Sequence, residues 1–264
     1  MPNQINDNNI RKTILQAIKD IRSKFKRTYG SKFVVCYDNK NYWRRQYFPP
    51  YKAHRKAQRE AIKVDWNAIF QISDQVKAEL IENFPYYSLD VEQAEADDVI
   101  AVLAMLYARP DDRILIVSGD KDFGQLHGPF VDQYDPIRNK KIVVSDPKQF
   151  LLEHVITGDR GDGIPNVLSD DHCLVTKTRQ TKLMQKRKQQ IISNVAAFCE
   201  ENNTNKRNWE RNCKLIDLTQ IPKRVRTDII EAFVNHRPLP TRENVRKYLI
   251  KQKLPTLLTD LNDF

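Results

Sequence analysis

Short apolar runs that each stop at an acidic residue alternate with amphipathic segments in the first part of this chain. SKFVVCYD ends at Asp38, and RILIVSGD, with four consecutive aliphatic residues, ends at Asp120. Between these runs, residues 65–83 and the segment that follows Asp90 carry apolar side chains at helical spacing. Such alternation predicts an α/β domain built around a mostly parallel central sheet that helices flank.

The same pattern continues along the chain and then changes. Residues 10–28 read as an amphipathic helix. Further short strands are predicted near 84–90, 130–134 and 141–144. After about residue 155 the sequence is more basic, and weaker helical patterns cover 190–202, 225–235 and 243–251. We therefore expect an α/β domain over 1–155 and a helical domain over 156–264.

The charge of the chain favours a polyanionic partner. There are 44 Lys and Arg against 34 Asp and Glu, which gives a formal net charge of +10 and a pI near 9.3. Nucleic acid is the commonest polyanion, although a protein with a solvated basic face has the same composition. No apolar run approaches the ~20 residues of a membrane helix, and no export signal is evident. The cysteines (Cys36, Cys173, Cys199 and Cys213) suggest no disulfide framework, so we expect a reducing, cytoplasmic location.

Acidic residues gather at the predicted strand ends and at one helix start. The clusters are Asp38; Glu95, Asp97 and Asp98; Asp120 and Asp122; and Asp159 and Asp162 in the loop GDRGDG. Because the carboxyl ends of parallel strands meet at one edge of a sheet, we expect these carboxylates to converge. Glu95 and Asp98 are three residues apart and share a helix face.

Convergent carboxylates repel one another and raise each other's pKa, and a divalent cation relieves that conflict. An oxygen-rich set without His or Cys suits magnesium or manganese rather than zinc. Two such ions can clamp a phosphodiester, one generating a hydroxide nucleophile and one stabilising the leaving oxygen. Taken singly, each acid is better explained as a turn residue, an N-cap or an acidic first helical turn than as a metal ligand. Their joint occurrence favours the metal site.

Residues 39–64 mix bases with aromatic rings and are expected to emerge beside Asp38. The bases are Arg44, Arg45, Lys52, Arg55, Lys56 and Arg59, and the rings are Tyr42, Trp43, Tyr47, Phe48 and Tyr51. Bases neutralise phosphates while rings stack on exposed nucleobases. The alternative is a core-facing aromatic stripe with solvated bases. A second basic patch contains Lys177, Arg179, Lys182, Lys186, Arg187 and Lys188, and is either a helical hairpin that grips a duplex backbone or an ordinary exposed helix.

Several motifs become recognisable when they are taken in order. They are CYDN (36–39), YWRR (42–45), YKAHR (51–55), EADD (95–98), SGDKDF (118–123) and GDRGDGIPN (158–166). This set resembles the 5′-nuclease superfamily of flap endonucleases, and within it the ribonuclease H group of T-even bacteriophages. Each motif is weak alone, whereas the whole set at suitable separations is specific. The likeness extends over nearly the whole chain, including the tail LPTLLTDLNDF.

The resemblance implies a PIN-like α/β catalytic domain, followed by a helical DNA-binding domain with a helix-hairpin-helix-type element. It implies 5′→3′ exonuclease and flap endonuclease activity on RNA–DNA and DNA duplexes with 5′ ends or flaps. The implied role is removal of RNA primers during phage DNA replication. Two Mg²⁺ ions, with Mn²⁺ as a substitute, are the implied cofactors. A phage single-strand-DNA-binding protein is the implied partner of a monomer in the host-cell cytoplasm, away from the membrane.

The resemblance also assigns roles to particular side chains. The acids that match metal ligands, directly or through water, are Asp38, Glu95, Asp97, Asp98, Asp120, Asp122, Asp159 and Asp162. The bases that match contacts to the scissile phosphate, or the arch over the 5′ end, are Lys52, Arg44 and Arg55. Tyr51 matches a base-stacking position, and further DNA contacts are expected from Arg45, Lys56, Lys177, Arg179 and Lys182.

Two departures from the family pattern bear on function. Family members begin with a strand that ends in Asp before the first helix, and this sequence opens at that helix, so the strand has no counterpart. GDRGDGIPN is followed by VLSDDHCLVTKTRQ and not by the GxGxKTA hairpin of cellular relatives. The T-even type also departs from that hairpin. A strand that is expected to be missing favours an alternative, a catalytically impaired or truncated relative that binds branched or 5′-ended DNA without cleaving it. A PIN-type toxin ribonuclease fits less well, because such chains are shorter and have no basic helical second domain.

Overall fold

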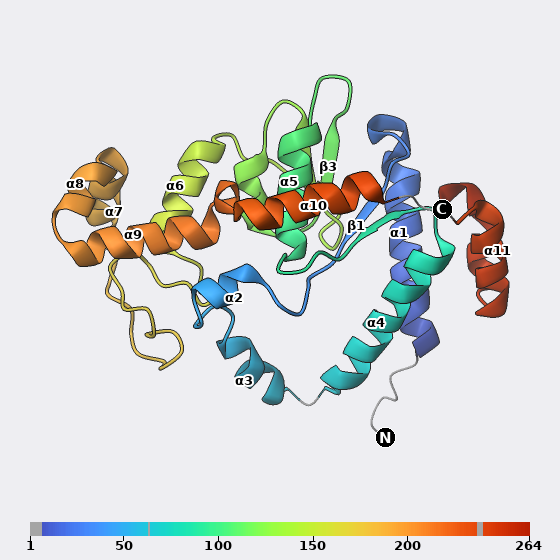
Figure 1. The fold of residues 1–264 in the computed structure, drawn as a ribbon, viewed down its shortest axis with the longest axis horizontal. Coiled ribbons are helices and arrows are strands. Elements are labelled where there is room, and N and C mark those ends of the chain that lie inside the picture. Colours follow the sequence, from blue (N-terminus) through green and yellow to red (C-terminus); the bar gives the residue numbers. More distant parts are fainter. Residues whose placement is uncertain (1–6, 63, 237–239) are drawn as a thin grey trace. The chain divides into compact units, whose positions relative to one another are not determined.

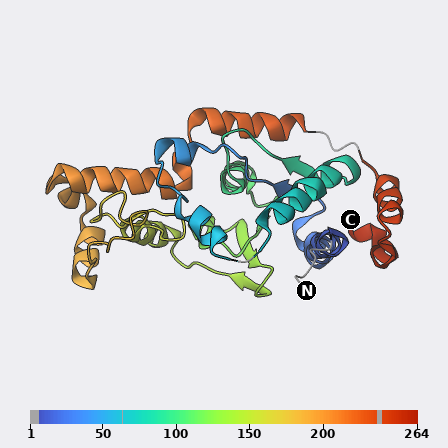
Figure 2. The ribbon, with the colours of Figure 1, turned by 90° about the horizontal axis from the view of Figure 1, so that it is seen from below.

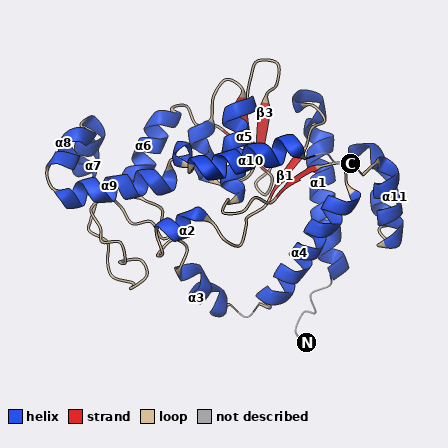
Figure 3. Ribbon diagram, in the orientation of Figure 1, coloured by secondary structure: helices blue, strands red, loops and turns tan. Residues whose placement is uncertain are grey.

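The computed structural model describes residues 7–62, 64–236 and 240–264, and these form helices joined to a few short strands (Figures 1 and 3). The chain divides into two compact units. The first comprises residues 1–37, 62–90 and 231–264, and the second comprises residues 38–61 and 91–230. Among the described helices, none has both the length and the apolar character needed to cross a membrane.

The first unit is formed by both ends of the chain and one internal segment. Its elements are α1 (Asp7–Tyr29), β1 (Val34–Cys36), α4 (Trp66–Asn83), β2 (Tyr87–Leu89), α11 (Arg242–Lys251) and the 3₁₀ segment η3 (Pro255–Asp263). β1 and β2 pair in parallel, with Val34 opposite Tyr87. Figure 2 looks nearly along α1, with α4 beside it. The predicted strands at 31–38 and 84–90 are therefore present in shorter form.

The core of this unit follows from the apolar face predicted for the first helix. Leu15 is fully buried, and Ile10, Ile14 and Ile18 pack against the same cluster of side chains. The rest of that cluster is Ile72, Val76, Leu80, Phe84, Tyr86, Val245, Tyr248, Leu249, Leu254, Leu257 and Phe264. The C-terminal tail therefore forms part of this core.

A buried ion pair crosses the same core. Arg11 on α1 donates through Nε and Nη2 to the two carboxylate oxygens of Glu79 on α4, at 2.7 and 2.9 Å. The hydroxyl of Tyr248 donates to Glu79 at 2.7 Å. Because both charges and the hydroxyl are paired, these polar groups are satisfied within an apolar surrounding.

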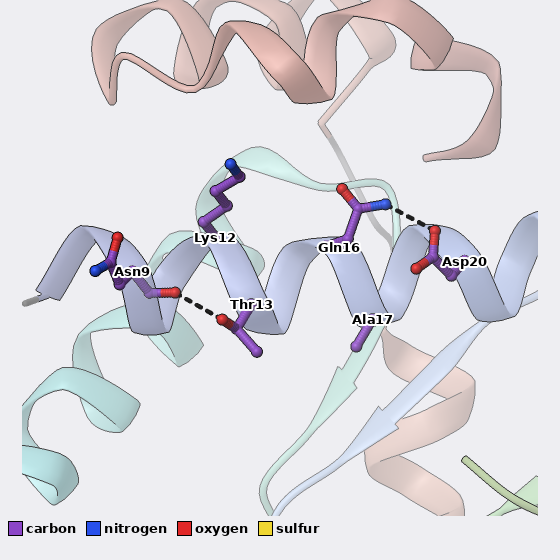
Figure 4. A pocket seen from close by; sticks show the side chains of 6 residues that line it. All are labelled: Asn9, Lys12, Thr13, Gln16, Ala17 and Asp20. Carbon is purple, nitrogen blue, oxygen red and sulfur yellow. Dashed lines mark hydrogen bonds between the residues drawn. The ribbon is translucent and has the colours of Figure 1, made fainter. Parts of the chain in front are cut away.

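A shallow depression lies along one side of α1 (Figure 4). Its volume is about 500 Å³ and its lining residues are Asn9, Lys12, Thr13, Gln16, Ala17 and Asp20. Gln16 donates to Asp20 at 2.7 Å, and Thr13 donates to the carbonyl of Asn9 at 2.8 Å. None of the acids or bases singled out by the sequence lines this depression.

The second unit contains every acid and base that the sequence marks as a site residue. Its elements are α2 (Trp43–Tyr47), α3 (His54–Glu60), α5 (Ala96–Tyr107), β3 (Ile114–Val117), the 3₁₀ segment η1 (Lys121–Leu126), β4 (Val131–Asp135), β5 (Lys140–Ile142), α6 (Pro147–Thr157), α7 (Gln185–Ser193), α8 (Val195–Glu200), α9 (Asn203–Ile216) and η2 (Leu218–Gln220). The boundary between the units falls inside α10 (Lys223–Asn235). β3 pairs with β4 in parallel, and β4 pairs with β5 in antiparallel. The described strands thus form a two-stranded sheet and a three-stranded sheet, in which two of the three strand pairs are parallel.

Helices α6 and α9 were not predicted, and both position the candidate site. α6 begins at an Asp-Pro signal: the side chain of Asp146 accepts from the backbone N–H of Gln149 at 2.9 Å, and Pro147 occupies the first turn. The helix ends at Gly158, whose φ of 71° lies in the left-handed region. A Cβ atom there would lie 2.4 Å from the carbonyl oxygen of Pro165, so only glycine allows this close approach.

Helix α9 has a buried face that is polar. Asn208, Arg211 and Asn212 lie on it, and each is more than nine-tenths buried. Asn212 donates to the carbonyls of Val155 and Pro165 at 2.8 and 2.9 Å. These bonds hold the end of α6 and the start of the following loop, and Figure 1 shows α6 to α9 as one group of helices.

Candidate active site

The N-terminus of α5 holds two buried carboxylates in a reciprocal cap. Glu95 is the N-cap residue, and the side chain of Asp98 accepts from the Glu95 backbone N–H at 3.0 Å. Glu95 is 2% exposed and Asp98 is fully buried. Asp38, which follows β1 in the sequence, accepts from the backbone N–H of Ala96 at 2.9 Å. Free N–H groups at a helix start stabilise negative charge, so this position collects acids.

Arg44 forms ion pairs with both buried acids. Its Nη1 lies 3.0 Å from Glu95 and 2.7 Å from Asp98, and its Nε donates to the carbonyl of Leu215 at 2.9 Å. Burial alone would lower the pKa of Arg44, but the charges of Asp98 and Glu95 raise it above its usual value. Arg44 is 3% exposed. In this structure Arg44 contacts the two acids and a backbone carbonyl, and its contact with a scissile phosphate stays a prediction.

Tyr51 and Lys52 connect Glu95 with the Gly/Asp loop. The hydroxyl of Tyr51 lies 3.1 Å from Glu95 and 2.9 Å from Asp162. Lys52 donates to Glu95 at 2.6 Å, and its backbone N–H donates to the carbonyl of Asp162 at 2.7 Å. Gly163 has a φ of 76°, and a Cβ there would meet the carbonyl oxygen of Pro50 at 2.9 Å. The loop thus packs tightly on this segment and places Asp162 beside Glu95.

The end of β3 adds further acids to the same group. Asp120 caps η1 by accepting from the backbone N–H of Asp122 at 2.9 Å. Burial, and then the charge of Asp120, raise the pKa of Asp97 to about 7. Burial also raises the pKa of Asp122 to about 6, with Asp120 adding to the rise and His154 opposing it. The acids that follow β3 therefore act on Asp97, at the start of α5, as the sequence predicts.

Asp159 is held differently from its neighbours. Its Oδ1 accepts from the backbone N–H groups of Gly161 and Asp162 at 2.7 and 3.1 Å. Its Oδ2 lies 2.7 Å from Lys121 Nζ and 3.2 Å from His154 Nε2. Burial alone would raise the pKa of Asp159, but the bonds from His154 and Lys121 hold it well below its usual range. Asp159 is therefore stably ionised and fully hydrogen-bonded.

The residues present fit a divalent cation. Asp97 and Asp122 are acids whose ionised forms are disfavoured here, and the Oδ1 of Asp122 is buried without a hydrogen-bond partner. Asp122, His154 and Asp159 each offer a ligand atom within 4.8 Å of the others. A bound cation would compensate these charges and complete the coordination of the unpaired oxygen.

This electrostatic conflict predicts how stability varies with pH. Because the folded-state pKa values of Asp97 and Asp122 are raised to about 7 and about 6, the folded protein binds extra protons from about pH 4 upward. The stabilisation that this protonation contributes is present below the unfolded pKa and is lost as pH rises through 6 to 7. We expect the metal-free protein to have a lower melting temperature at pH 8 than at pH 5, because its free energy of unfolding falls by up to about 1.4 kcal/mol per pH unit for each group between the unfolded and the folded pKa.

The check is a thermal unfolding series in a chelator, repeated with added Mg²⁺. The cation should raise the melting temperature more at pH 8 than at pH 5, since it binds the ionised carboxylates. Asp97→Asn should flatten the metal-free profile. Equal melting temperatures across this range in the wild-type protein would contradict the described charge conflict.

In the basic–aromatic segment 39–64, several rings face the core and several bases are exposed, as in the alternative to base stacking. Trp43, Phe48 and Tyr51 are 5% exposed or less, and Phe48 and Tyr51 belong to a core cluster with Val155 and Leu215. The ring of Tyr51 lies in the core and its hydroxyl bonds to Glu95 and Asp162, so its stacking on a nucleobase stays a prediction. Exposed members of the segment are Arg45, Tyr47, Arg55, Lys56 and Arg59.

The second basic patch is only partly helical. Lys177, Arg179 and Lys182 are exposed and lie in the irregular segment that precedes α7. Lys186, Arg187 and Lys188 lie on α7 itself, where Arg187 pairs with Glu201 and Lys188 with Glu153. The first three residues and Lys186 are therefore more accessible than Arg187 and Lys188.

Sequence reasoning missed His154 and Lys121. His154 lies one turn before the end of α6, and Lys121 stands between two acids in SGDKDF. The sequence did contain a signal for His154, which lies five residues before Asp159 in a segment that starts with Asp146-Pro147, a helix-start signal. The burial of the imidazole between Asp122 and Asp159 was not readable, because the two acids are far apart in the sequence.

Two family models together span almost all of the chain. Residues 3–155 match the model described as "5′-3′ exonuclease, N-terminal resolvase-like domain". Residues 146–264 match the model described as "T4 RNase H, C terminal". These matches agree with the resemblance that the ordered motifs indicate.

Individual relatives agree with the family models. The chain is 32% identical over 272 residues to Ribonuclease H of Enterobacteria phage T4, covering 99% of this chain and 88% of that protein. It is 34% identical over 133 residues to Flap endonuclease Xni of Shewanella sp. strain MR-4, covering 47% of this chain and 48% of that protein.

Solved structures with low sequence identity share the fold. A bacteriophage T5 flap endonuclease in complex with DNA and metal ions has a TM-score of 0.55 and 19% identity, covering 93% of each chain. A T5 5′-exonuclease with bound zinc has a TM-score of 0.54 and 18% identity, covering 91% of this chain and 90% of that one. The PIN-like α/β fold with a helical domain is thereby confirmed, and the chain belongs to the 5′-3′ exonuclease family of nucleases, with a C-terminal part of the T4 ribonuclease H type.

Proposed function

We propose that this protein is a magnesium-dependent 5′→3′ exonuclease and flap endonuclease. Its substrates are DNA and RNA–DNA duplexes with 5′ ends or flaps, and its role is removal of RNA primers during phage DNA replication. The names of its relatives, a ribonuclease H and flap endonucleases, support the activity class. The T5 relative solved with DNA supports the type of substrate.

The observation that carries the proposal is the charge conflict among the acids. The pKa values of Asp97 and Asp122 are raised to about 7 and about 6, and the charge of Asp120 contributes to both shifts. Lys52 and Arg55 are bases of the same group of side chains. The acids that would hold two Mg²⁺ ions, directly or through water, are Asp38, Glu95, Asp97, Asp120, Asp122 and Asp162. When bound, such ions supply a hydroxide nucleophile and stabilise the leaving oxygen.

The acids divide into direct-ligand candidates and supporting residues. Asp98 is fully buried and bonded to Arg44, Trp43 and the Glu95 backbone, so it orients Glu95 without facing the substrate. Asp162 and Glu95 share Tyr51 and Lys52, which hold them in place in the protein without metal. The chain's own contribution is thus to keep several carboxylates close together against their mutual repulsion.

The bases have matching places around the acids. Lys52 and Arg55 pair with Asp162, and Arg55 is 44% exposed at its side chain. These two can contact a phosphate that reaches the acids, whereas Arg45 and Lys56 are exposed for the flanking backbone. Lys177, Arg179 and Lys182 provide further phosphate contacts. Neutralisation of phosphates by such cations makes binding depend on salt.

Lys52 offers a test of this arrangement. We expect Lys52→Met to lower the cleavage rate at saturating substrate about tenfold, because a cation near the transferred phosphate stabilises charge that develops in the transition state. Lys56→Met is the matched control, since Lys56 is exposed on the adjacent helix α3. It should weaken binding slightly and reduce the salt dependence, with little change in the saturated rate. Equal effects of the two changes on the saturated rate would argue against the role given to Lys52.

The decisive experiment is cleavage of a labelled 5′ flap and of a nicked RNA–DNA duplex with Mg²⁺ and with chelator. Short products that need Mg²⁺ support the proposal. Salt-sensitive binding without any cleavage would instead establish the alternative, a relative that recognises 5′-ended DNA without cutting it. The division into domains 1–155 and 156–264, the monomeric state, the host cytoplasm and a phage single-strand-DNA-binding partner stay predictions.

A further inference from the structure

His154 on α6 occupies the space between two acids that the sequence places far from each other. Its side chain is 6% exposed. Its Nε2 lies 3.2 Å from Asp159 Oδ2, and its Nδ1 lies 3.5 Å from Asp122 Oδ1. Each ring nitrogen therefore faces a different carboxylate.

The carboxylates of Asp159 and Asp122 differ in how many hydrogen-bond donors they receive. Asp159 already receives N–H donors on both oxygens: Gly161 and Asp162 on Oδ1, and Lys121 and His154 on Oδ2. A carboxylate has about four lone-pair sites, so these donors satisfy Asp159 without a cation. Asp122 is the opposite case, because its Oδ1 is buried without a hydrogen-bond partner.

The Nδ1 atom of His154 is also buried without a hydrogen-bond partner. When Nε2–H donates to Asp159, Nδ1 presents a lone pair toward the Oδ1 of Asp122. Two acceptors that face each other at 3.5 Å are unfavourable unless a positive centre lies beside both. Two ligands of one ion, each about 2.1 Å from it, lie roughly 3.0 to 3.4 Å apart, which is close to the observed separation.

We propose that His154 Nδ1 and Asp122 Oδ1 are direct ligands of one metal ion in this nuclease, with Asp159 as the carboxylate that orients the imidazole. This inference rests on the proposed function, because it concerns one of the two cations of that site. A histidine ligand that donates its other ring N–H to a carboxylate is the usual arrangement around protein-bound metals. Lys121 and the two loop N–H groups fix that carboxylate in turn.

A nitrogen ligand changes which cation the site prefers. Imidazole nitrogen is a ligand of transition-metal ions, whereas magnesium favours oxygen ligands. The site that contains His154 should therefore bind Mn²⁺ more tightly relative to Mg²⁺ than a site built from carboxylates alone. This departs from the oxygen-only ligand set that the sequence suggested.

Pulsed electron paramagnetic resonance of Mn²⁺ bound to the full-length chain tests the ligand directly. We expect a ¹⁴N coupling of directly bound imidazole, replaced by the ¹⁵N pattern when the protein is made with ¹⁵N-histidine. The labelled wild-type protein needs no substitution, so the result does not depend on a variant that folds. Absence of directly bound nitrogen would overturn the proposal and leave His154 as a hydrogen-bonding bridge between two acids.

Variants then assign the nitrogen to a residue. His154→Gln should abolish the coupling, whereas His172→Gln, at an exposed position, should retain it. His54→Gln is the stricter control, because His54 also has a buried Nδ1 without a partner and follows the Tyr51–Lys52 segment. Loss of the coupling in His54→Gln, with retention in His154→Gln, would overturn the assignment.

Calorimetric titration separates this inference from the nuclease proposal. We expect His154→Gln to weaken Mn²⁺ binding at least about tenfold and Mg²⁺ binding less. Equal weakening for both cations would contradict a nitrogen ligand. A protein that shows the coupling but cleaves no substrate would retain this inference and lose the proposed function, and the reverse result would do the opposite.

Discussion

Replacing Asp120 by asparagine is expected to lower Mg²⁺-dependent cleavage of a 5′ flap about 1000-fold. Asp120 is exposed at the end of β3, and its charge contributes to the raised pKa of Asp97. Removing one charged ligand takes several kcal/mol from the stabilisation that a metal ion gives the transition state, and about 4 kcal/mol corresponds to this factor. Asparagine keeps an oxygen that can accept from the backbone N–H of Asp122, so η1 should retain its cap.

Asp146→Asn is the matched control for this change. Asp146 is also an exposed N-cap aspartate, and it accepts from the backbone N–H of Gln149 at 2.9 Å. It is not among the acids of the candidate site, so cleavage should stay within about twofold of wild type. Substrate binding, measured by fluorescence anisotropy in chelator, should survive in both variants. Comparable cleavage by Asp120→Asn and Asp146→Asn would remove the metal role assigned to Asp120.

Replacing Arg44 by methionine is expected to lower the free energy of unfolding by about 3–5 kcal/mol. The guanidinium of Arg44 is the cation paired with both Glu95 and Asp98, and all three side chains are 3% exposed or less. Without it, Asp98 loses its countercharge, Glu95 keeps only Lys52, and the carbonyl of Leu215 loses a donor. Methionine is similar in length and preserves packing, so the loss reports mainly on the charges.

Arg45→Met provides the comparison for Arg44. Arg45 is the next residue on the same short helix, but it is exposed, and its replacement should change stability by less than about 0.5 kcal/mol. Urea denaturation monitored by far-UV circular dichroism measures both values. If Arg44→Met were as stable as wild type and impaired only in substrate affinity, Arg44 would be a phosphate-contacting residue, as the family resemblance implies.

Periodicity was sufficient for elements with one apolar face. The first helix, the helix 65–83 and the strand that ends at Asp120 all lie where the pattern predicts them, with β3 reduced to Ile114–Val117. α9 was missed because its buried face carries Asn205, Asn208 and Asn212 in place of apolar residues. These amides donate to backbone carbonyls of α6, of α8 and of the loop that follows α6, and a hydrophobic pattern does not show such polar contacts.

Residue identity and spacing also predict which acids belong to the site, but they do not predict the hydrogen bonds of each one. Glu95 and Asp98 form a reciprocal helix cap, and Asp159 is saturated by N–H donors. Equivalent acids in a sequence therefore differ in whether they keep a free lone pair. That difference depends on donors from other segments, which sequence spacing does not specify.

By itself, the sequence determined the α/β class, the basic character and the set of acids, because local patterning and composition are properties of neighbouring residues. Only the tertiary structure decided that the rings of Trp43, Phe48 and Tyr51 are buried. It also decided that Arg44 pairs with the buried carboxylates at the start of α5. It alone placed His154 between Asp122 and Asp159. Burial and the pairing of charges depend on contacts between residues far apart in the chain, and these contacts exist only once the chain has folded.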